Sequence, residues 1–183
     1  MANKTQLATA GEQQAAIVIN NSFIDGLVKQ LEEKCKYGLS FPKDYNLSNA
    51  LMGAYLTLKE TKDRNNKPVL ESCTATSIAN SLMNMATLGL SVQKKQGYFI
   101  SYGNQCQFQR SYFGNITIAR RYGMKDIHAE IIYQGDKFKY HIEDGNKVLD
   151  SHEQDFMNID NDKILGAYAV VQMEDGSKHS ELM

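Results

Sequence analysis

Basic and aromatic residues are interleaved in one stretch of the chain that contains no carboxylate. Residues 72–125 include neither Asp nor Glu in 54 positions. Cations in such a stretch would bind a phosphate backbone and its aromatic rings would stack on bases, with no acid to repel the ligand. The pattern therefore favours a nucleic-acid site over an ordinary solvated basic face. The basic residues are Lys94, Lys95, Arg110, Arg120, Arg121 and Lys125, and the aromatic residues include Tyr98, Phe99, Tyr102, Phe108, Tyr112 and Phe113.

The charge of the chain is strongly polarised along the sequence. Residues 1–71 carry nine basic and eight acidic side chains, a sum of +1, and residues 72–125 carry six basic side chains, a sum of +6. Residues 126–183 carry five basic and thirteen acidic side chains, a sum of −8. The formal net charge of −1 therefore conceals a basic centre beside an acidic C-terminal part.

Metal and nucleotide chemistry have less support in the sequence. No His lies near a Cys at the spacing of zinc ligands, and no G-x-x-x-x-G-K-[ST] motif is present to bind ATP. The carboxylates Asp144, Asp150 and Asp155 could hold Mg²⁺ in a nuclease, but their spacing matches no EF-hand loop. A solvated acidic loop is favoured over a metal site. The acidic segment 143–162 could also contact the basic stretch of a neighbouring copy, giving head-to-tail assembly.

Length and composition indicate one folded domain, residues 1–183, because 183 residues with 42% apolar content can bury a core. The three Cys residues are odd in number and lack paired spacing, which favours a reducing compartment. No apolar run approaches about 18 residues, so we expect neither a signal peptide nor a membrane span. The expected location is the cytoplasm.

Helices are expected before the basic stretch. Residues 1–16 have no periodic pattern and are expected to form a disordered arm. Apolar residues at helical spacing predict a helix over 22–36, capped by Ser22 and ended at Gly38. A surface loop is expected at 62–68.

Two further helices are predicted around that loop. One runs from Ser48 to about Lys62, and the next is capped by Thr74 or Thr76 and ends at Gly89. The residues expected on the buried face of the first are Leu51, Met52, Tyr55, Leu56 and Leu58. Those expected on the buried face of the second are Ile78, Leu82, Met85 and Ala86.

A β-hairpin is predicted at the centre of the basic stretch. Residues 98–102 and 105–109 form two strand patterns, and Gly103-Asn104 between them is a two-residue turn. Alternation places Gln105, Gln107 and Gln109 on one face and Cys106, Phe108 and Arg110 on the other. The three amides could be simply the solvent side of a sheet, or could contact phosphates and base edges.

A short helix and a series of strands complete the prediction. The helix covers 113–122, with Ile116, Ile118 and Ala119 inward; Arg120 and Arg121 at its C-terminal end could serve only the helix dipole. The strand patterns cover 127–133, 137–142, a buried 164–173 and 178–183, with an acidic loop and at most a helical turn over 150–163. The fold class is therefore α+β: N-terminal helices, a central β-hairpin with a following helix, and a C-terminal antiparallel β-sheet.

Several short motifs follow one another in order along the chain: Cys73-Thr74, Ser77-Ile78, Leu82-Met83, Leu88–Leu90, Gly97–Tyr102, Cys106–Gln109, Tyr112, Gly114, Ala119–Arg121, Gly123, Gly166–Ala169 and Asp175-Gly176. Together they resemble the RecT family of phage single-strand annealing proteins, the recombinases grouped with Redβ. The resemblance covers residues 70–183, and its specificity comes from the order and spacing of the motifs together. Ala75, Phe113 and Asn115 depart from the family pattern.

The resemblance implies a non-catalytic protein that binds single-stranded DNA and anneals complementary strands without ATP, as a helical or ring oligomer. No cofactor would be required, and Mg²⁺ would act only through the DNA. The family further implies annealed duplex DNA as a ligand, a bacterial cytoplasmic location, and a phage exonuclease and a host single-strand-binding protein as partners. Those partners would bind a C-terminal region that this chain is expected to lack.

On this hypothesis the DNA-binding residues fall into three groups, and no residue makes or breaks a covalent bond. The expected phosphate contacts are Lys94, Lys95, Arg110, Arg120 and Arg121, with Lys125 peripheral. The expected base or sugar contacts are Tyr98 and Tyr112, and the neutral hydrogen-bonding residues are Gln107 and Gln109. The alternatives are a nucleic-acid-binding module without annealing activity, a sequence-specific reader, a Mg²⁺-dependent nuclease and an assembly protein.

Overall fold

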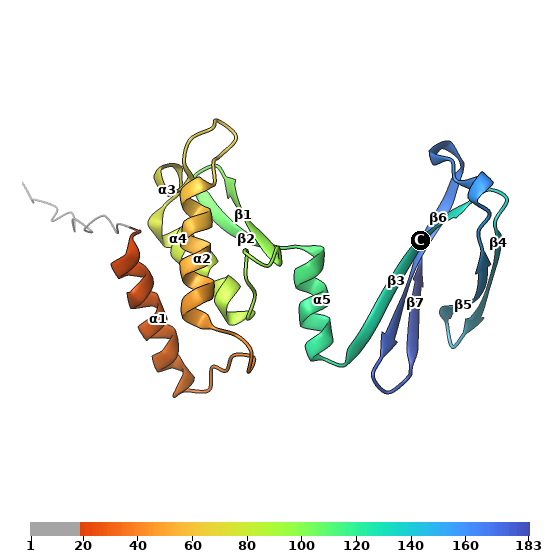
Figure 1. The fold of residues 1–183 in the computed structure, drawn as a ribbon, viewed down its shortest axis with the longest axis horizontal. Helices are drawn as coiled ribbons and strands as arrows, with labels where there is room; N and C mark the ends of the chain where they lie inside the picture. Colours follow the sequence, from red (N-terminus) through yellow and green to blue (C-terminus); the bar gives the residue numbers. More distant parts are fainter. Residues whose placement is uncertain (1–18) are drawn as a thin grey trace, which may run out of the picture. The chain divides into compact units, whose positions relative to one another are not determined.

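The computed structural model describes residues 19–183, and the chain divides into two compact units. Unit 1 is Met1–Ser111 and unit 2 is Tyr112–Met183. This division does not test whether the chain folds as one domain, so the single-domain interpretation stays a prediction. The expected arm 1–16 lies outside the described residues. Helices precede antiparallel strands (Figure 1), which confirms the predicted α+β class.

Unit 1 consists of helices packed against a hairpin. Its elements are α1 (Asn21–Cys35), α2 (Leu47–Glu60), α3 (Val69–Ser72), α4 (Ala75–Thr87), β1 (Gly97–Tyr102) and β2 (Gln105–Arg110). Helix α1 packs against α2, α2 against α4, and α4 against β2. The core between them is closed to solvent, since its largest members have at most 1% of their surface exposed. Those members are Ile24, Leu31, Leu51, Leu58, Val69, Ile78, Leu82, Met85 and Leu90.

The helix starts in unit 1 are set by short polar side chains. Asn20, and not the predicted Ser22, caps α1 by accepting a hydrogen bond from the Phe23 backbone N–H at 2.9 Å. Thr74 caps α4 in the same way through Ser77, as one of the two predicted caps. The Ser22 prediction was wrong because Asn20 lies three residues before Phe23, the reach an N-cap side chain needs.

Two further expectations for unit 1 were wrong or incomplete. Leu56 is 51% exposed, so it does not lie on the buried face of α2. Helix α3 was not predicted, because four residues after Pro68 are too few to show a helical period. The predicted burial of the α4 face is confirmed, since all four residues have no exposed surface.

Helix α4 covers the outer edge of β2. The Ser81 hydroxyl donates to the Cys106 carbonyl at 2.8 Å, and the Cys106 N–H donates to the Ser77 hydroxyl at 3.0 Å. The Thr74 N–H also donates to the Asn104 carbonyl in the hairpin turn. These bonds satisfy backbone groups that an edge strand would otherwise leave unpaired. They fix the hairpin on the helical part of unit 1.

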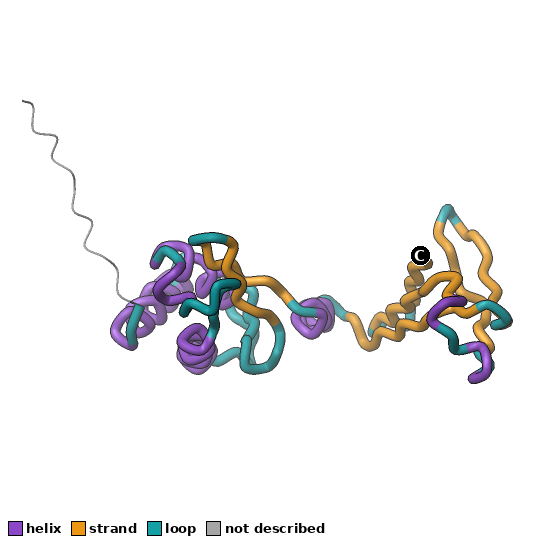
Figure 2. The backbone as a smooth tube through the Cα atoms, turned by 90° about the horizontal axis from the view of Figure 1, so that it is seen from above, coloured by secondary structure: helices purple, strands orange, loops and turns teal. Residues whose placement is uncertain are grey.

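Unit 2 begins with a helix and is otherwise mostly strand (Figure 2). Its elements are α5 (Tyr112–Arg121), β3 (Met124–Tyr133), β4 (Lys137–Glu143), β5 (Asn146–Glu153), the helical turns η1 (Phe156–Asn158) and η2 (Asn161–Lys163), β6 (Ile164–Met173) and β7 (Lys178–Leu182). The strands form an antiparallel sheet of order β3-β6-β7 and a separate β4–β5 hairpin. A small cluster of Ile132, Tyr168 and Leu182 packs with Phe138, Leu149 and Val170.

Three predictions for unit 2 need correction. Strand β6 is not a buried strand, because Tyr168 is its one buried residue, Ile164 and Leu165 are exposed, and its other residues are only partly buried. Strand β5 was not predicted, and its last residues lie in the segment 150–163 that was expected to be a loop. The turns η1 and η2 lie where the helical turn was expected. The inward residues of α5 are only half-buried, and its one buried residue is Gly114.

Candidate nucleic-acid interface

The hairpin β1–β2 has one packed face built around a glycine. A Cβ atom on Gly97 would lie 2.3 Å from Cζ of Phe108, so only glycine lets that ring cover the start of β1. The Phe99 and Phe108 rings pack with centroids 5.7 Å apart, and Cys106 is buried beside them. Because this face is filled, alternate side chains of both strands must point the other way.

The opposite face, which we call the hairpin face, presents aromatic rings and amides. Tyr98 is 53% exposed and Tyr102 is 43% exposed. The Gln109 amide Nε2 donates to the Tyr102 hydroxyl at 2.7 Å, which orients both side chains across the strands. The cross-strand pairs of this face are Tyr98 with Gln109, Ile100 with Gln107, and Tyr102 with Gln105. The face therefore offers stacking surfaces and neutral hydrogen-bonding groups together.

Three predicted cations lie at the open end of the hairpin. Lys94 and Lys95 belong to the turn before β1, and Arg110, at the end of β2, is paired with Gly97. Lys95 has φ of 57°, a left-handed conformation that is costly for a residue other than glycine. The Ser111 N–H donates to the Gln96 carbonyl at 3.1 Å and holds this turn against the end of β2. All three cations are exposed, as phosphate binding requires.

A second group of predicted residues belongs to unit 2. Tyr112, 59% exposed, begins α5, and its ring packs edge-on against Phe113. Arg120 and Arg121 are exposed in the last turn of α5, and Lys125 is exposed in β3. The predicted site residues thus form two groups, each described within its own unit: the hairpin group Lys94, Lys95, Tyr98, Gln107, Gln109 and Arg110, and the helix group Tyr112, Arg120, Arg121 and Lys125.

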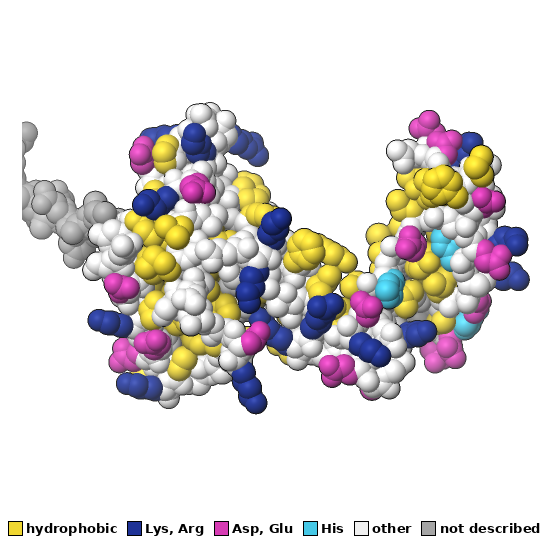
Figure 3. Space-filling model, in the orientation of Figure 1, with side chains coloured by type: hydrophobic (Ala, Val, Ile, Leu, Met, Phe, Trp, Pro, Cys, Tyr) yellow, Lys and Arg dark blue, Asp and Glu magenta, His cyan; other side chains and the backbone are white. Residues whose placement is uncertain are grey.

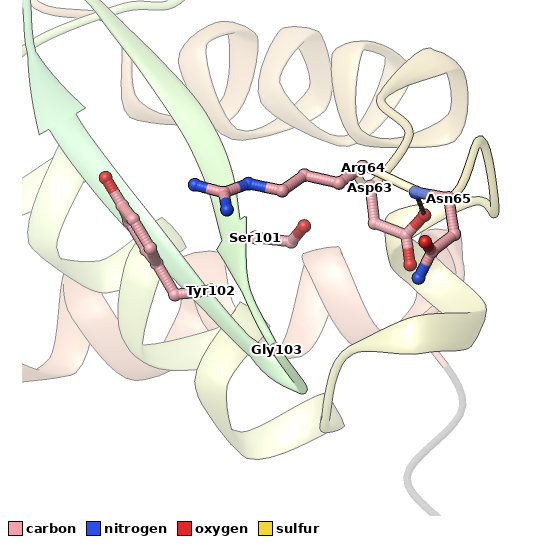
Figure 4. Close-up of a pocket in the computed structure, with 6 residues that line it drawn as sticks. All are labelled: Asp63, Arg64, Asn65, Ser101, Tyr102 and Gly103. Carbon is pink, nitrogen blue, oxygen red and sulfur yellow. Dashed lines mark hydrogen bonds between the residues drawn. The ribbon is translucent and has the colours of Figure 1, made fainter.

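Two residues that were not among the predicted site residues lie together at the turn end of the hairpin. Arg64, in the α2–α3 loop, and Tyr102, in β1, line one pocket together (Figure 4). The signal in the sequence was the basic composition of the loop KDRNNKP, but Arg64 and Tyr102 lie 38 positions apart in the chain. Only the folded chain brings the loop to the hairpin.

The Cys106 thiol lies on the packed face of the hairpin, opposite the hairpin face, and fills space there. Burial raises the pKa of Cys106 to about 11, against the opposing effect of its contact with Ser81. A thiol with this pKa is neutral at pH 7 and is a poor nucleophile. Cys73 is buried as well, whereas Cys35 is exposed, and all three cysteines are free.

The carboxylates considered for Mg²⁺ have local structural contacts. Asp150 lies 2.8 Å from Nδ1 of His141, Asp155 accepts the Met157 N–H at 2.9 Å, and Asp144 lies in the β4–β5 turn. Within residues 19–183, no three His, Cys, Asp or Glu side chains gather closely enough to hold a metal ion. Over the same range, no helix has both the length and the apolar character needed to cross a bilayer.

Comparison with known proteins identifies the class of protein that carries this site. The RecT family profile matches residues 48–183, which is most of the chain. The chain therefore belongs to the RecT family. It is also 31% identical over 115 residues to the uncharacterized protein YqaK of Bacillus subtilis (strain 168). That match covers 61% of this chain and 39% of the relative, so the chain spans about two fifths of the length of that protein.

Proposed function

We propose that this chain binds single-stranded DNA and anneals complementary strands without ATP, as an oligomer. Membership of the RecT family supports a phage-type recombination and annealing protein. The observation that carries the proposal is the β1–β2 hairpin in an acid-free stretch: its exposed face presents Tyr98 and the Gln107 and Gln109 amides, and three exposed cations lie at its open end. The oligomer, the exonuclease and single-strand-binding partners, and the bacterial cytoplasmic location rest on the family alone.

The chemistry of the proposed site is non-covalent. Lysine and arginine would release the counter-ions of the DNA backbone, and Tyr98 would stack on a base without regard to its identity. The amides of Gln107 and Gln109 donate hydrogen bonds without adding charge, which suits contact with bases or sugars. Annealing would be accelerated because neutralised strands repel each other less and are held at high effective concentration.

The test is annealing of two complementary oligonucleotides added one after the other, without ATP. One variant combines Lys94→Ala, Lys95→Ala and Arg110→Ala, and a second combines Arg120→Ala and Arg121→Ala. A matched control removes three charges from α1 and its C-cap residue in the same unit, by replacing Lys29, Lys34 and Lys36 with Ala. We expect the wild-type chain and the control to anneal, and the hairpin variant to lose annealing. The loss of annealing in the second variant measures how much the helix group contributes to annealing.

Salt dependence measures the number of phosphate contacts directly. Five contacts predict a slope of log K against log salt of about −3.5, from ~0.7 per contact on single strands. The hairpin variant lacks three of these contacts, so its slope of log K against log salt should be shallower by about 2. At 0.1 M salt this change in slope corresponds to binding that is weaker by roughly 100-fold. An unchanged slope would remove the hairpin cations from the site. Binding without annealing would instead support a nucleic-acid-binding module, and shortened strands in Mg²⁺ would support a nuclease.

A further inference from the structure

A pocket of about 330 Å³ lies between the α2–α3 loop and the turn end of the β1–β2 hairpin. Its lining residues are Asp63, Arg64, Asn65, Ser101, Tyr102 and Gly103. This volume lies at the lower end of the range of small-molecule sites, roughly 300–1,000 Å³. In Figure 4 the Arg64 side chain extends from the loop over the hairpin, and its guanidinium group is directed towards Tyr102.

The charges around the pocket leave the guanidinium group available. The Asp63 carboxylate accepts hydrogen bonds from the backbone N–H groups of Asn65, at 2.8 Å, and Lys67, at 2.9 Å. These bonds stabilise the turn in the loop. In Figure 4 this carboxylate points away from the guanidinium group of Arg64. None of the ion pairs found between residues 19 and 183 involves Arg64.

The backbone of β1 adds polar groups on the same side. Ser101 is paired with Cys106, whose N–H and carbonyl turn away from β1 to bond with Ser77 and Ser81. In an antiparallel ladder, both members of such a pair point their backbone groups away from each other. The N–H and carbonyl of Ser101 therefore face the outer edge of β1, where the loop carrying Arg64 lies.

The aromatic wall of the pocket is already oriented. The Tyr102 hydroxyl accepts a hydrogen bond from the Gln109 amide at 2.7 Å, and Tyr102 remains 43% exposed. Gly103 has φ of 61° and open space at its Cβ position, so no side chain closes the pocket at the turn. The pocket thus combines a fork-shaped cation, a backbone edge and an aromatic ring.

We propose that this pocket binds one nucleotide of a single DNA strand, with its phosphate on Arg64 and Ser101 and its base on Tyr102. This inference rests on the proposed function and extends the strand path beyond the predicted residues. A planar guanidinium group can bind phosphate oxygens through two hydrogen bonds, and a tyrosine ring can stack on any base. The cations at the open end and Arg64 at the turn end lie about one six-residue strand apart, roughly 20 Å. At the ~3.4 Å spacing of a B-form strand this distance takes about six nucleotides.

The chain offers its own reporter for this site because it contains no Trp. The variant Tyr102→Trp places a single indole in the pocket, and a fluorescein-labelled dT oligonucleotide reports binding separately through anisotropy. We expect unlabelled dT oligonucleotide to quench the indole emission and salt to restore it. Arg64→Ala in the same background should reduce the quenching and weaken affinity roughly fivefold at 0.1 M salt, with ~0.7 lost from the salt slope.

Matched variants separate a nucleotide site from general charge attraction. Lys67→Ala removes one charge from the same exposed loop but not from the pocket, so its effect should be much smaller than that of Arg64→Ala. Arg64→Lys keeps the positive charge but lacks the forked guanidinium group that can bind phosphate through two hydrogen bonds. Its affinity for DNA should therefore lie between those of Arg64→Ala and the wild-type chain. Should Tyr102→Trp unfold, the comparison of Arg64→Ala with Lys67→Ala in the wild-type background decides, because both residues lie on an exposed loop.

The outcomes distinguish this inference from the function on which it rests. Oligonucleotide binding with unchanged indole emission, and equal effects of Arg64→Ala and Lys67→Ala, would overturn the pocket and leave the proposed function standing. Absence of any anisotropy change with the wild-type chain would overturn both. Quenching that depends on Arg64 but not on Lys67 would support the nucleotide site.

Discussion

The two hairpins of the chain share a construction and differ in charge. Both β1–β2 and β4–β5 are two-stranded and antiparallel, and both present a half-exposed tyrosine, Tyr98 at 53% and Tyr140 at 48%. Residues 94–111, around the first hairpin, carry three basic side chains and no acid. Residues 137–153, which form the second, carry three Lys and four carboxylates. The two hairpins therefore share an exposed aromatic residue and are distinguished by their charge.

The difference lies in where each hairpin uses its charges. In β4–β5 the acidic side chains have partners across the strands: the Lys137 ammonium lies 2.9 Å from the Glu153 carboxylate, and the His141 ring lies 2.8 Å from the Asp150 carboxylate. Acidic, basic and His side chains are intermixed on the visible face of unit 2 (Figure 3). In β1–β2 the pair at the open end is Gly97 with Arg110, and the exposed cross-strand positions hold neutral glutamines. The cations at the end of this hairpin therefore keep their charge for a ligand. Electrostatics, more than strand geometry, separates the two surfaces.

The two hairpins also rest on different cores. Beneath β1–β2 lies α4, whose inward residues are fully buried and whose serines bond to the edge of β2. Beneath β4–β5 lies a small cluster that includes Ile132, Tyr168 and Leu182. A rigid scaffold suits a binding surface because less conformational entropy is lost when the ligand binds.

The largest expected effect is on stability, and it tests the contrast between the cores. Phe108→Ala removes a ring that is 7% exposed over Gly97 and should cost about 3–5 kcal/mol. Phe138→Ala removes a ring that is only partly buried and should cost less, about 1–2 kcal/mol. Urea unfolding gives the free energies, and hydrogen exchange by peptide assigns each loss to its unit. Equal costs would contradict the contrast between the cores.

The next effect is on DNA affinity, and it tests the contrast in charge. Tyr98→Ala should weaken binding of single-stranded DNA by about 1–3 kcal/mol, the usual value of one stacked base. Tyr140→Ala removes a similarly exposed ring beside carboxylates and should leave affinity unchanged. Anisotropy titrations of both variants at one salt concentration make the comparison. A loss of affinity in Tyr140→Ala alone would move the proposed site to unit 2.

The sequence predicted the first hairpin well because its signals are local. Gly103-Asn104 is a turn, and alternation on either side assigns the faces without any knowledge of the rest of the fold. Strand β5 was missed because it follows a turn signal and its acidic residues resemble those of a loop. Its partners lie in β4, where Lys137 pairs with Glu153 and stabilises the strand through a cross-strand contact.

The candidate site was predicted in composition but not in extent. The hairpin group follows from charge and alternation in residues 94–110, which are contiguous in the chain. Arg64 could not be found in the same way, since its relation to Tyr102 depends on how the α2–α3 loop folds back to the hairpin. Burial in unit 2 was overestimated because an apolar strand such as β6 does not reveal whether both faces of its sheet are covered.

The smallest effect at neutral pH concerns a buried polar network that joins β4–β5 to the sheet of unit 2. Nε2 of His152 lies 3.1 Å from the Asp136 carboxylate and Nδ1 lies 3.1 Å from the Tyr168 hydroxyl. The Asp136 side chain has no exposed surface. Burial would raise the pKa of this carboxyl, but the Tyr133 N–H and the Asn158 amide, together with His152, outweigh it and lower the pKa to about 2. The ionised carboxylate is therefore the form that the folded unit prefers.

Because the folded pKa of Asp136 lies below the ordinary value of 3.8, its contribution to stability is present above about pH 4 and is lost as the pH falls towards 2. Asp136→Asn should remove that part of the acid dependence and lower the stability of unit 2 at pH 5–7. Asp144→Asn is the matched control, since Asp144 is exposed in the β4–β5 turn with φ of 49°, a conformation that asparagine also adopts. Hydrogen exchange of unit 2 at pH 5 and pH 3 measures the difference. If the stability of unit 2 in Asp136→Asn fell with acid as much as in the wild-type chain, other carboxylates would have to account for the acid dependence. The small apolar cluster alone would then hold the β4–β5 hairpin against the sheet.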